Sequence, residues 1–140
     1  MTDMNELYKE IIIELYRNPL NKKELEKPDA EAKDVNPACG DVVGIQITAG
    51  DGIIEDIGFQ GYGCAISQSA ASVLTEMVKG GRIEDAVKTN IDEVLKELHL
   101  ESLRNNASRI KCAALSLKVL KVALYKYLGQ HEDVDWKSVV

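Results

Sequence analysis

The sequence predicts an α+β fold, in which one N-terminal helix is followed by a β-hairpin and then by helices only, the last of them long. Two observations support this prediction. β-Branched residues gather in two short runs joined by a Gly-rich turn, and hydrophobic residues recur with helical spacing on either side of them. The 140 residues, 45% of them hydrophobic, suit a single domain over 1–140. Within it, residues 1–34 are expected to form a helix and a mobile connector.

The N-terminal helix is predicted from Asp3 to Arg17. Hydrophobic residues four positions apart place one apolar stripe along it: Leu7, Ile11 and Leu15. Asn18-Pro19 should end this helix, because the residue before a proline disfavours the helical conformation. Residues 21–33 are rich in Lys and Glu and have no hydrophobic period, so a solvated connector is expected there.

The β-hairpin is predicted from two runs of residues, Val42–Thr48 and Ile53–Phe59. Residues 49–52, which read Ala-Gly-Asp-Gly, have the composition of a tight turn between antiparallel strands. Successive side chains of a strand point to opposite faces of the sheet. Ile45 and Ile47 should therefore lie on the same face.

Four helices are predicted after the hairpin. The first spans residues 65–79, and a short second helix spans 83–88. Asn90 should cap a third helix, whose hydrophobic residues follow amphipathic spacing. The last helix should begin near Ser108 as its cap and end at Gly129.

The C-terminal tail, residues 130–140, is polar and has no hydrophobic period. It contains the one tryptophan of the chain, Trp136. Chain ends are commonly frayed, so this residue is either part of a frayed terminus or a docking anchor.

Charge and hydropathy exclude several classes of function. The chain has 17 Lys and Arg against 23 Asp and Glu, a net charge of −6, and the basic residues form no dense run, so nucleic acid is not an expected partner. No apolar stretch approaches the roughly 20 residues that cross a bilayer, and the N-terminus has no signal pattern. A cytoplasmic location without membrane partners is expected.

The three cysteines are the candidate chemistry of this sequence. An odd number of cysteines without an export signal argues against a disulfide framework and leaves thiolate chemistry, metal binding or plain burial. Cys39 lies in a loop rich in Pro and Gly, while Cys64 and Cys112 fall at predicted helix N-termini, where the helix dipole favours a thiolate. Burial in an apolar core would instead favour the neutral thiol over the thiolate.

A carboxylate, Asp41, stands two residues after Cys39. Three thiolates and a carboxylate would bring about four negative charges together, which only cations could hold in a low dielectric. The cysteines lie 25 and 48 positions apart, so the chain has no CxxC knuckle, and spacing alone is weak support for a metal site. As a loop carboxylate beside Gly40, Asp41 has no expected role in the fold.

Each cysteine lies in a motif of its own. The three motifs, in chain order, are Asn36-Pro37-Ala38-Cys39-Gly40-Asp41, then Phe59-Gln60-Gly61-Tyr62-Gly63-Cys64-Ala65-Ile66-Ser67, then Arg109-Ile110-Lys111-Cys112-Ala113-Ala114-Leu115. Together with the opening helix around Tyr16-Arg17-Asn18-Pro19, they resemble the iron–sulfur cluster assembly scaffold family known as IscU, SufU or the NifU N-terminal domain. The resemblance spans nearly the whole chain.

The resemblance implies an α+β domain whose small antiparallel sheet is covered by helices, with the site at one exposed end. Cys39, Cys64 and Cys112 would be thiolate ligands of a nascent [2Fe-2S] cluster, or of zinc in the resting protein, and Asp41 a further ligand or a gate. Sulfur would arrive as a persulfide from a cysteine desulfurase of the IscS or SufS type, with each cysteine a candidate acceptor. Iron would be the second component, and apo iron–sulfur proteins the recipients. Such a scaffold is not an enzyme, and a homodimer is compatible with it.

Two departures from the family pattern concern the third motif. IscU members carry a His before the third cysteine and a Leu-Pro-Pro-Val-Lys signal for an Hsp70 chaperone, whereas this chain has Lys111 and no such signal, so a dedicated Hsp70 chaperone is not an expected partner. Residues 109–112 look more like SufU, but SufU proteins carry an extra segment for which the 48-residue spacing is too short. Lys111 either offsets the negative charge of the site or is a solvated helix residue.

Two other functions fit the same cysteines. A zinc-dependent sulfur acceptor of the SufU type would hold zinc with three Cys and one Asp, and one thiolate would leave the metal to accept sulfur. A thiol enzyme with Cys64 as nucleophile would need a general base, but no motif contains a histidine. The missing SufU segment favours the scaffold over the zinc transferase.

Overall fold

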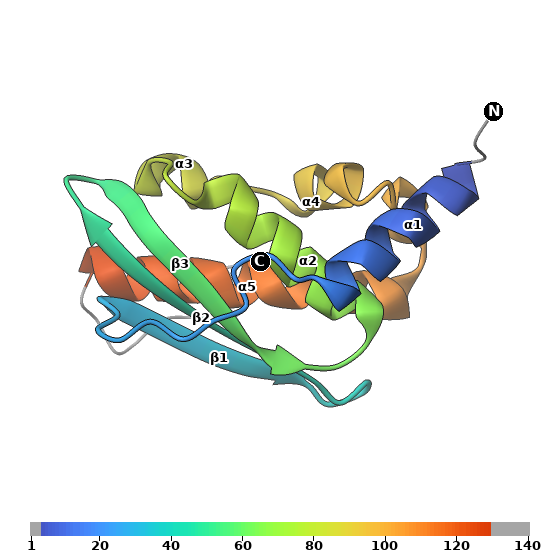
Figure 1. Cartoon of the computed structure of the whole chain (residues 1–140), viewed down its shortest axis with the longest axis horizontal. Helices are drawn as coiled ribbons and strands as arrows, with labels where there is room; N and C mark the ends of the chain where they lie inside the picture. The colour runs from blue at the N-terminus through green and yellow to red at the C-terminus, as the bar shows by residue number, and fades with distance from the viewer. Residues whose placement is uncertain (1–3, 130–140) are drawn as a thin grey trace.

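The computed structural model describes residues 4–129, with side chains from residue 9 onward. Three antiparallel strands form one sheet in the order β1-β2-β3 (Figure 1). Their bounds are β1 Ala30–Asn36, β2 Asp41–Gly50 and β3 Ile53–Tyr62. The predicted hairpin is confirmed: β2 and β3 are joined at Asp51 and Gly52, both with positive φ, as in the type I′ turns that suit hairpins.

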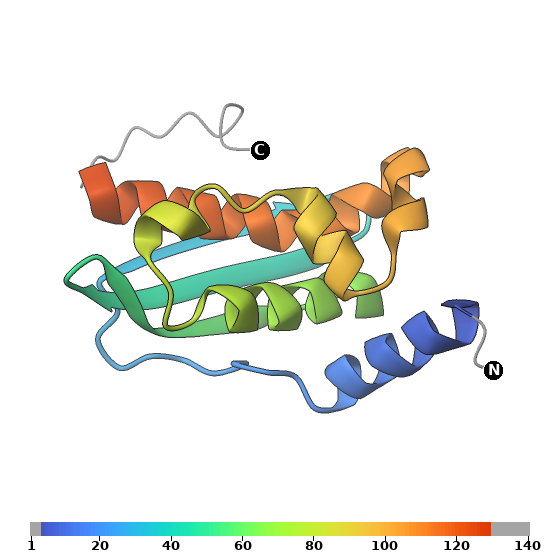
Figure 2. The same ribbon diagram turned by 90° about the horizontal axis from the view of Figure 1, so that it is seen from above.

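Six helical segments accompany the sheet. Their bounds are α1 Met4–Arg17, α2 Ala65–Val78, α3 Ile83–Ala86, α4 Ile91–Glu97, the 3-10 helix η1 Glu101–Asn105 and α5 Ala107–Gly129. Figure 2 shows α2 lying between α1 and the long α5, and α2 packs against both. Among residues 4–129, no helix combines the length and apolar content needed to cross a membrane.

The core lies between the sheet and the two helices α2 and α5. Ile45 and Ile47 point to it from β2, as predicted, and are fully buried opposite Phe59 and Ile57 of β3. Leu74 of α2 is also fully buried in this core. Apolar burial of this kind is the main stabilising term of a small domain, so it fixes both helices over the sheet. Helices α2 and α5 both begin near the same end of the sheet (Figure 1).

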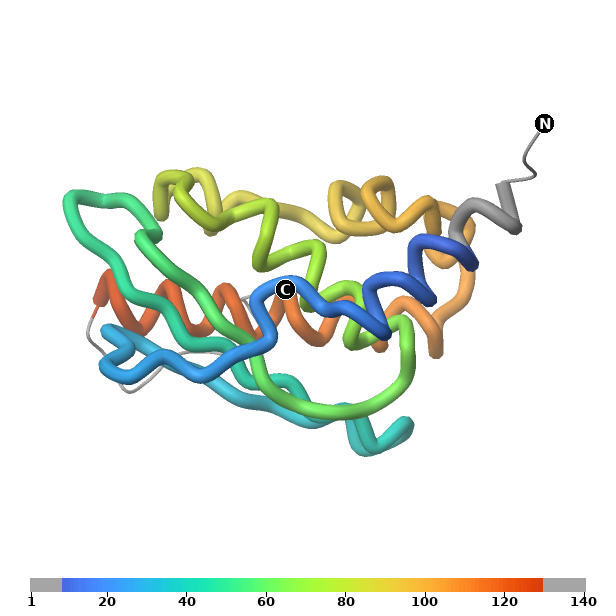
Figure 3. The backbone as a smooth tube through the Cα atoms, in the orientation of Figure 1, coloured from blue at the N-terminus to red at the C-terminus, as the bar shows by residue number. Residues whose placement is uncertain are grey.

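Residues 18–29, which we call the strap, run from α1 past the edge of β3 and across the face of the sheet turned away from α2 and α5 to reach β1 (Figure 3). Asn21 and Lys23 exchange backbone hydrogen bonds with Phe59, so the strap pairs briefly with β3 in parallel. Gln60 donates to the Lys23 carbonyl at 2.6 Å, and Gln46 accepts from the Leu25 N–H at 2.8 Å. The pairing with Phe59 covers part of the β3 edge, which would otherwise present unpaired backbone groups.

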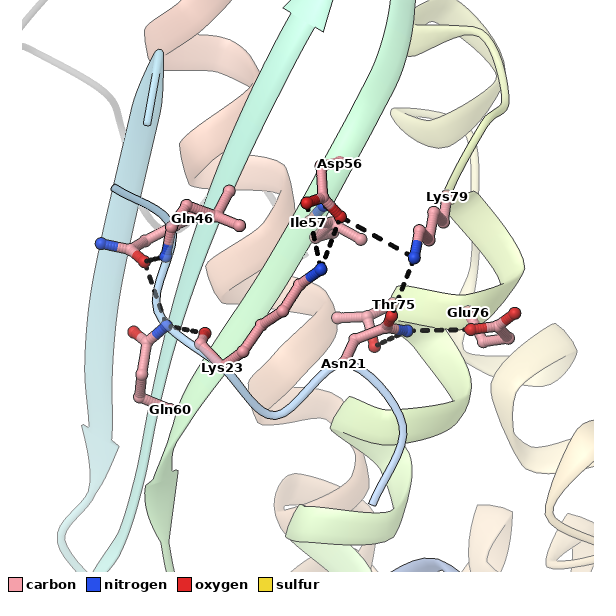
Figure 4. A network of polar contacts seen from close by, with 10 residues as sticks. Asn21, Lys23, Gln46, Asp56, Ile57, Gln60, Thr75, Glu76 and Lys79 are labelled. Atoms are coloured by element: carbon pink, nitrogen blue, oxygen red, sulfur yellow. Dashed lines mark hydrogen bonds and ion pairs between the residues drawn. The ribbon is translucent and has the colours of Figure 1, made fainter. Parts of the chain in front are cut away.

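Charged side chains complete the attachment of the strap. Figure 4 shows Lys23 reaching Asp56 at 2.9 Å, with Lys79 on the same carboxylate at 3.8 Å, and Asn21 bonded to Thr75 and Glu76. Partial burial would raise the pKa of Asp56, but the hydrogen bond from Lys23 and the two positive charges outweigh it, and the pKa lies below its usual value.

Three local predictions need correction. The residues predicted as a connector include strand β1, whose hydrophobic signal is weak because it is an edge strand with only Ala32 buried. The last helix begins at Ala107, and Asn106, whose Oδ1 accepts from the Arg109 N–H, takes the role predicted for Ser108. The segment η1 had no counterpart among the predicted elements. The predicted start at Asp3, the Leu7 side chain and Trp136 lie outside the described residues.

Candidate metal centre

The turn between β1 and β2 supplies the first two groups of the site. Asn36 and Asp41 form the last residue pair between β1 and β2. Residues 37–40 form the turn between these two strands, which carries the exposed Cys39. Asn36 Oδ1 accepts from the Ala38 N–H at 3.3 Å, as asparagines at turns commonly do. Asp41 is the first residue of β2 and is fully buried.

The junction between β3 and α2 supplies the third group. Cys64 is the N-cap of α2, and its Sγ accepts from the Ser67 N–H at 3.4 Å. Its own N–H donates to Asp41 Oδ1 at 2.8 Å, which ties this junction to the start of β2. Gly63 has a φ of +148°, and a Cβ there would collide with the Asp41 carboxylate. Glycine at this position therefore allows the buried carboxylate to approach the chain.

Helix α5 supplies the fourth group. The Sγ of Cys112 lies 3.4 Å from that of Cys39, 3.9 Å from Asn36 Nδ2 and 3.9 Å from the Ser108 carbonyl. Burial raises the pKa of the Cys112 thiol, and the hydrogen bond with Cys39 and the nearby Cys64 raise it further. A thiolate at this position therefore requires a compensating cation.

Three potential ligand atoms converge at this end of the sheet. One atom each from Cys39, Asp41 and Cys112 lies within 4.8 Å of the others. Cys64 is outside this set, but its Sγ lies 3.8 Å from Asp41 Oδ2. The four groups come from three separate places in the chain, and Cys39 and Cys64 are exposed while Asp41 and Cys112 are buried.

The donor set suits a soft or borderline metal. Thiolates bind zinc and iron, and a carboxylate is a common fourth ligand of either. Among the described residues, Asp41 has no ion pair with a Lys or Arg, so the site has no internal cation at the centre of its negative charge. The residues present therefore fit a metal or an iron–sulfur cluster.

The structure modifies two sequence-based predictions about the site. Cys64 does cap its helix, as predicted, but Cys112 lies in the second turn of α5 and not in the first, because the helix begins at Ala107. Asp41 is not a loop residue without a role in the fold: it belongs to β2 and accepts the Cys64 N–H. Lys111 is exposed on α5 beside Cys112.

Two residues near the site escaped the sequence analysis. Asn36 contacts Cys112, and the Asn-Pro pair at a turn was the signal that could have indicated it. Gln68, one turn after Cys64, is buried, and its Oε1 has no hydrogen-bond partner. A single sequence offers no signal for an unpaired buried amide.

Comparison with known proteins identifies the family. The NifU-like N-terminal domain matches residues 7–134, which is most of the chain. The chain belongs to this family. A NifU-like N-terminal structure from Brucella abortus shares the fold, with a TM-score of 0.79 at 20% identity over 92% of this chain and all of that one.

Two further relatives in the NifU-like family carry functional names. The iron–sulfur cluster assembly scaffold protein IscU of Haemophilus influenzae is 36% identical, over 86% of this chain and 94% of its own length. The zinc-dependent sulfurtransferase SufU of Bacillus subtilis is 33% identical, over 91% of this chain and 95% of its own length. The sequence-based family assignment and the α+β fold are thus confirmed.

Proposed function

We propose that this protein is a scaffold on which [2Fe-2S] clusters are assembled from iron and desulfurase-derived sulfur and from which they pass to apo proteins. The observation that supports the proposal best is the meeting of Cys39, Asp41 and Cys112 within 4.8 Å, with Cys64 beside them, at one end of the sheet. The IscU relative, named a cluster assembly scaffold, supports the same activity.

The proposed ligands are the thiolates of Cys39, Cys64 and Cys112 and the carboxylate of Asp41. Cys64 joins the other three by a rotation of its exposed side chain away from Ser67, because its Sγ already lies 3.8 Å from Asp41. A cluster contributes iron charge that the site needs to hold its thiolates close together. Exposed Lys111 gives electrostatic support at the rim.

Exposure divides these ligands into two pairs. Buried Asp41 and Cys112 would hold the cluster from inside, while exposed Cys39 and Cys64 face the partners. Sulfur then enters through an exposed thiolate, which attacks the outer sulfur of a donor persulfide. A new S–S bond forms, the donor S–S bond breaks, and the donor leaves as a thiolate. Reduction to sulfide takes two electrons from an external reductant.

A zinc-dependent sulfur acceptor is the second candidate, favoured by the SufU relative that is similar over 91% of this chain. Three Cys and one Asp would close a tetrahedral zinc site, and one thiolate would leave it when sulfur is accepted. The exposed Cys39 or Cys64 would be that thiolate. The protein would then be an enzyme of the sulfurtransferase class.

Anaerobic purification followed by iron, sulfide and zinc analysis distinguishes the two functions. With iron, cysteine and a desulfurase, a scaffold develops the visible absorption of a [2Fe-2S] centre with equal amounts of bound iron and sulfide. A zinc acceptor retains one zinc and gains a persulfide visible by mass spectrometry, without colour. The second result would replace the scaffold proposal.

A further inference from the structure

A pocket of about 240 Å³ opens on the side of the molecule next to Cys64. It is lined by the end of α1, the strap, the end of β3 and the start of α2, through Tyr16, Pro19, Lys22, Tyr62, Gly63 and Gln68. Gly63 contacts Asp41, and the Gln68 N–H donates to the Cys64 carbonyl at 3.2 Å, but none of the lining residues is a proposed metal ligand. The pocket is therefore a separate feature that borders the site.

Gln68, which lines this pocket, has an unpaired hydrogen-bond acceptor. The residue is 4% exposed, and its amide nitrogen donates to Ser67 while its Oε1 has no partner. An unpaired buried acceptor costs about 1–3 kcal/mol, so such groups usually bond to a ligand or to water. Oε1 is itself covered by protein, so a group that enters the pocket and donates one hydrogen bond would satisfy it once the Gln68 side chain turns its amide toward the pocket.

The rim of the pocket is aromatic and basic. Tyr16 is 55% exposed and Tyr62 67% exposed, which are high values for large side chains, and they stand on two different elements. Lys22 lines the pocket, and the exposed Arg17 follows Tyr16. Exposed apolar rings around a pocket are typical of docking sites, and the two cations select an acidic partner.

The C-terminal tail of this protein has the matching chemistry. An indole ring fits in a pocket of this size, stacks on tyrosine rings and donates one N–H while accepting nothing. Trp136 is the one tryptophan of the chain, and acidic residues precede it: Glu132, Asp133 and Asp135. We propose that Trp136 docks in the pocket formed by Tyr16, Tyr62 and Gln68, with its acidic neighbours on Lys22 and Arg17.

The length of the tail determines which molecule supplies it. Trp136 lies seven residues beyond Gly129, a reach of at most about 25 Å. The axial rise of α5 from Gly129 back to the level of Cys112 is itself about 25 Å. The pocket lies on the α1 side of α2, displaced sideways from α5 by about 8–10 Å or more. A tail extended to its limit would have to pass through α2 to reach the pocket of its own molecule, so a second copy of the chain supplies it.

Docking of this kind has a consequence for the site. The pocket includes Gly63, the neighbour of Cys64, so the tail of the second copy would cover one approach to that thiol. A dimer formed through two such tails is symmetric, because each copy gives one tail and receives one.

Tryptophan fluorescence tests the proposal on the full chain in the presence of a reductant. As concentration rises, the emission of Trp136 should shift to the blue while sedimentation shows a growing dimer fraction. Tyr16→Ala, a change at an exposed ring, should weaken the association at least tenfold, since aromatic anchors dominate such contacts. Tyr125→Ala removes a 43% exposed tyrosine of α5 that does not line the pocket, and should leave association unchanged.

A peptide measurement separates the remaining outcomes. A peptide of residues 130–140, added to full-length Trp136→Ala protein, should bind with a blue shift that Gln68→Leu weakens about tenfold through loss of the hydrogen bond. Emission typical of a solvated indole at every concentration would overturn the proposal. A blue shift that does not depend on concentration would overturn docking of the tail in a second copy. A blue shift that the Tyr16→Ala variant retains would mean that Trp136 docks outside this pocket.

Discussion

Two aspartates of the same sheet stand in opposite electrostatic settings. Asp56 of β3 accepts from Lys23 at 2.9 Å, has Lys79 at 3.8 Å, and its pKa is lowered. Asp41 of β2 is fully buried next to three cysteines, and its hydrogen-bond donor at 2.8 Å is the uncharged N–H of Cys64. The first carboxylate is neutralised by the protein itself, and the second is not.

The difference explains why one region is structural and the other is a candidate site. Around Asp56, Lys23 of the strap and Lys79 after α2 supply the positive charge that this carboxylate of β3 needs. Around Asp41 the fold assembles negative ligand atoms, and among the described residues Asp41 has no ion pair with a Lys or Arg. Such an arrangement is stabilised by what it binds, because a ligand that binds the folded state shifts the folding equilibrium.

The largest expected effect is loss of the cluster on removal of a thiol. Cys39→Ser, Cys64→Ser and Cys112→Ser should each prevent a stable [2Fe-2S] centre, because a hydroxyl is a poor substitute for a thiolate toward iron. The visible spectrum after anaerobic reconstitution measures this. A full-strength spectrum in Cys112→Ser would remove that residue from the proposed ligands.

The next effect concerns the close approach of the chain to Asp41. Gly63→Ala should destabilise the metal-free protein by about 2–4 kcal/mol, because a Cβ collides with the carboxylate and φ is positive. Gly80→Ala is the matched control: φ is +78° and nothing lies within 4 Å, so conformational strain alone should cost about 1 kcal/mol. Urea unfolding measures both. Equal losses would mean that the approach to Asp41 is not tight.

Two variants of Asp41 distinguish the effect of its negative charge from the effect of its hydrogen bond with Cys64. Asp41→Ala leaves the Cys64 N–H without its acceptor and should destabilise the metal-free protein by about 1–3 kcal/mol. Asp41→Asn keeps an acceptor oxygen and should cost less in stability, yet it should weaken zinc binding as much as Asp41→Ala does. Urea unfolding and zinc titration measure the two properties. Tighter zinc binding by Asp41→Asn would contradict a ligand role.

The strap should show a smaller, pH-dependent effect. Because the pKa of Asp56 is lower in the folded protein than in the unfolded chain, its ion pair stabilises the fold above the unfolded pKa of about 3.9, and this contribution is lost as pH falls through the folded value. Asp56→Asn should cost about 0.5 kcal/mol at pH 7, and this cost should disappear as the pH falls through the folded pKa of Asp56.

The exposed pair of Arg82 and Glu84 provides the control for the strap. It has the same kind of contact, at 2.8 Å, with side chains 65% and 64% exposed. Glu84→Gln should change the unfolding free energy less than Asp56→Asn at pH 7. An equal change would mean that the strap pair is an ordinary surface pair.

The smallest effect on stability is expected at Lys111. Lys111→Glu should shorten the lifetime of a reconstituted cluster several-fold while changing the unfolding free energy of the metal-free protein by less than about 0.5 kcal/mol. Lys121→Glu makes the same change of charge on the same helix, ten positions further along. It should leave the cluster lifetime unchanged. Equal lifetimes in the two variants would make Lys111 an ordinary solvated residue.

Local chemistry in the sequence determined much of this protein. The cap at Asn90 and the turn at Asp51 and Gly52 depend on bonds and torsions within a few residues, and both appear in the structure as predicted. The same holds for Cys64, which caps α2 through a contact three residues away. The three cysteine motifs also sufficed to indicate the family.

Tertiary structure decided the features that depend on partners far along the chain. β1 forms because its backbone pairs with β2, which its own charged sequence does not reveal. Helix α5 packs on the sheet and on α2, and Cys112 is buried there, which its place in the sequence near a helix start did not indicate. Asp41 is buried because Cys64, 23 residues later, donates to it. Contacts across such separations are fixed by packing of the whole core, and a short stretch of sequence contains no trace of them.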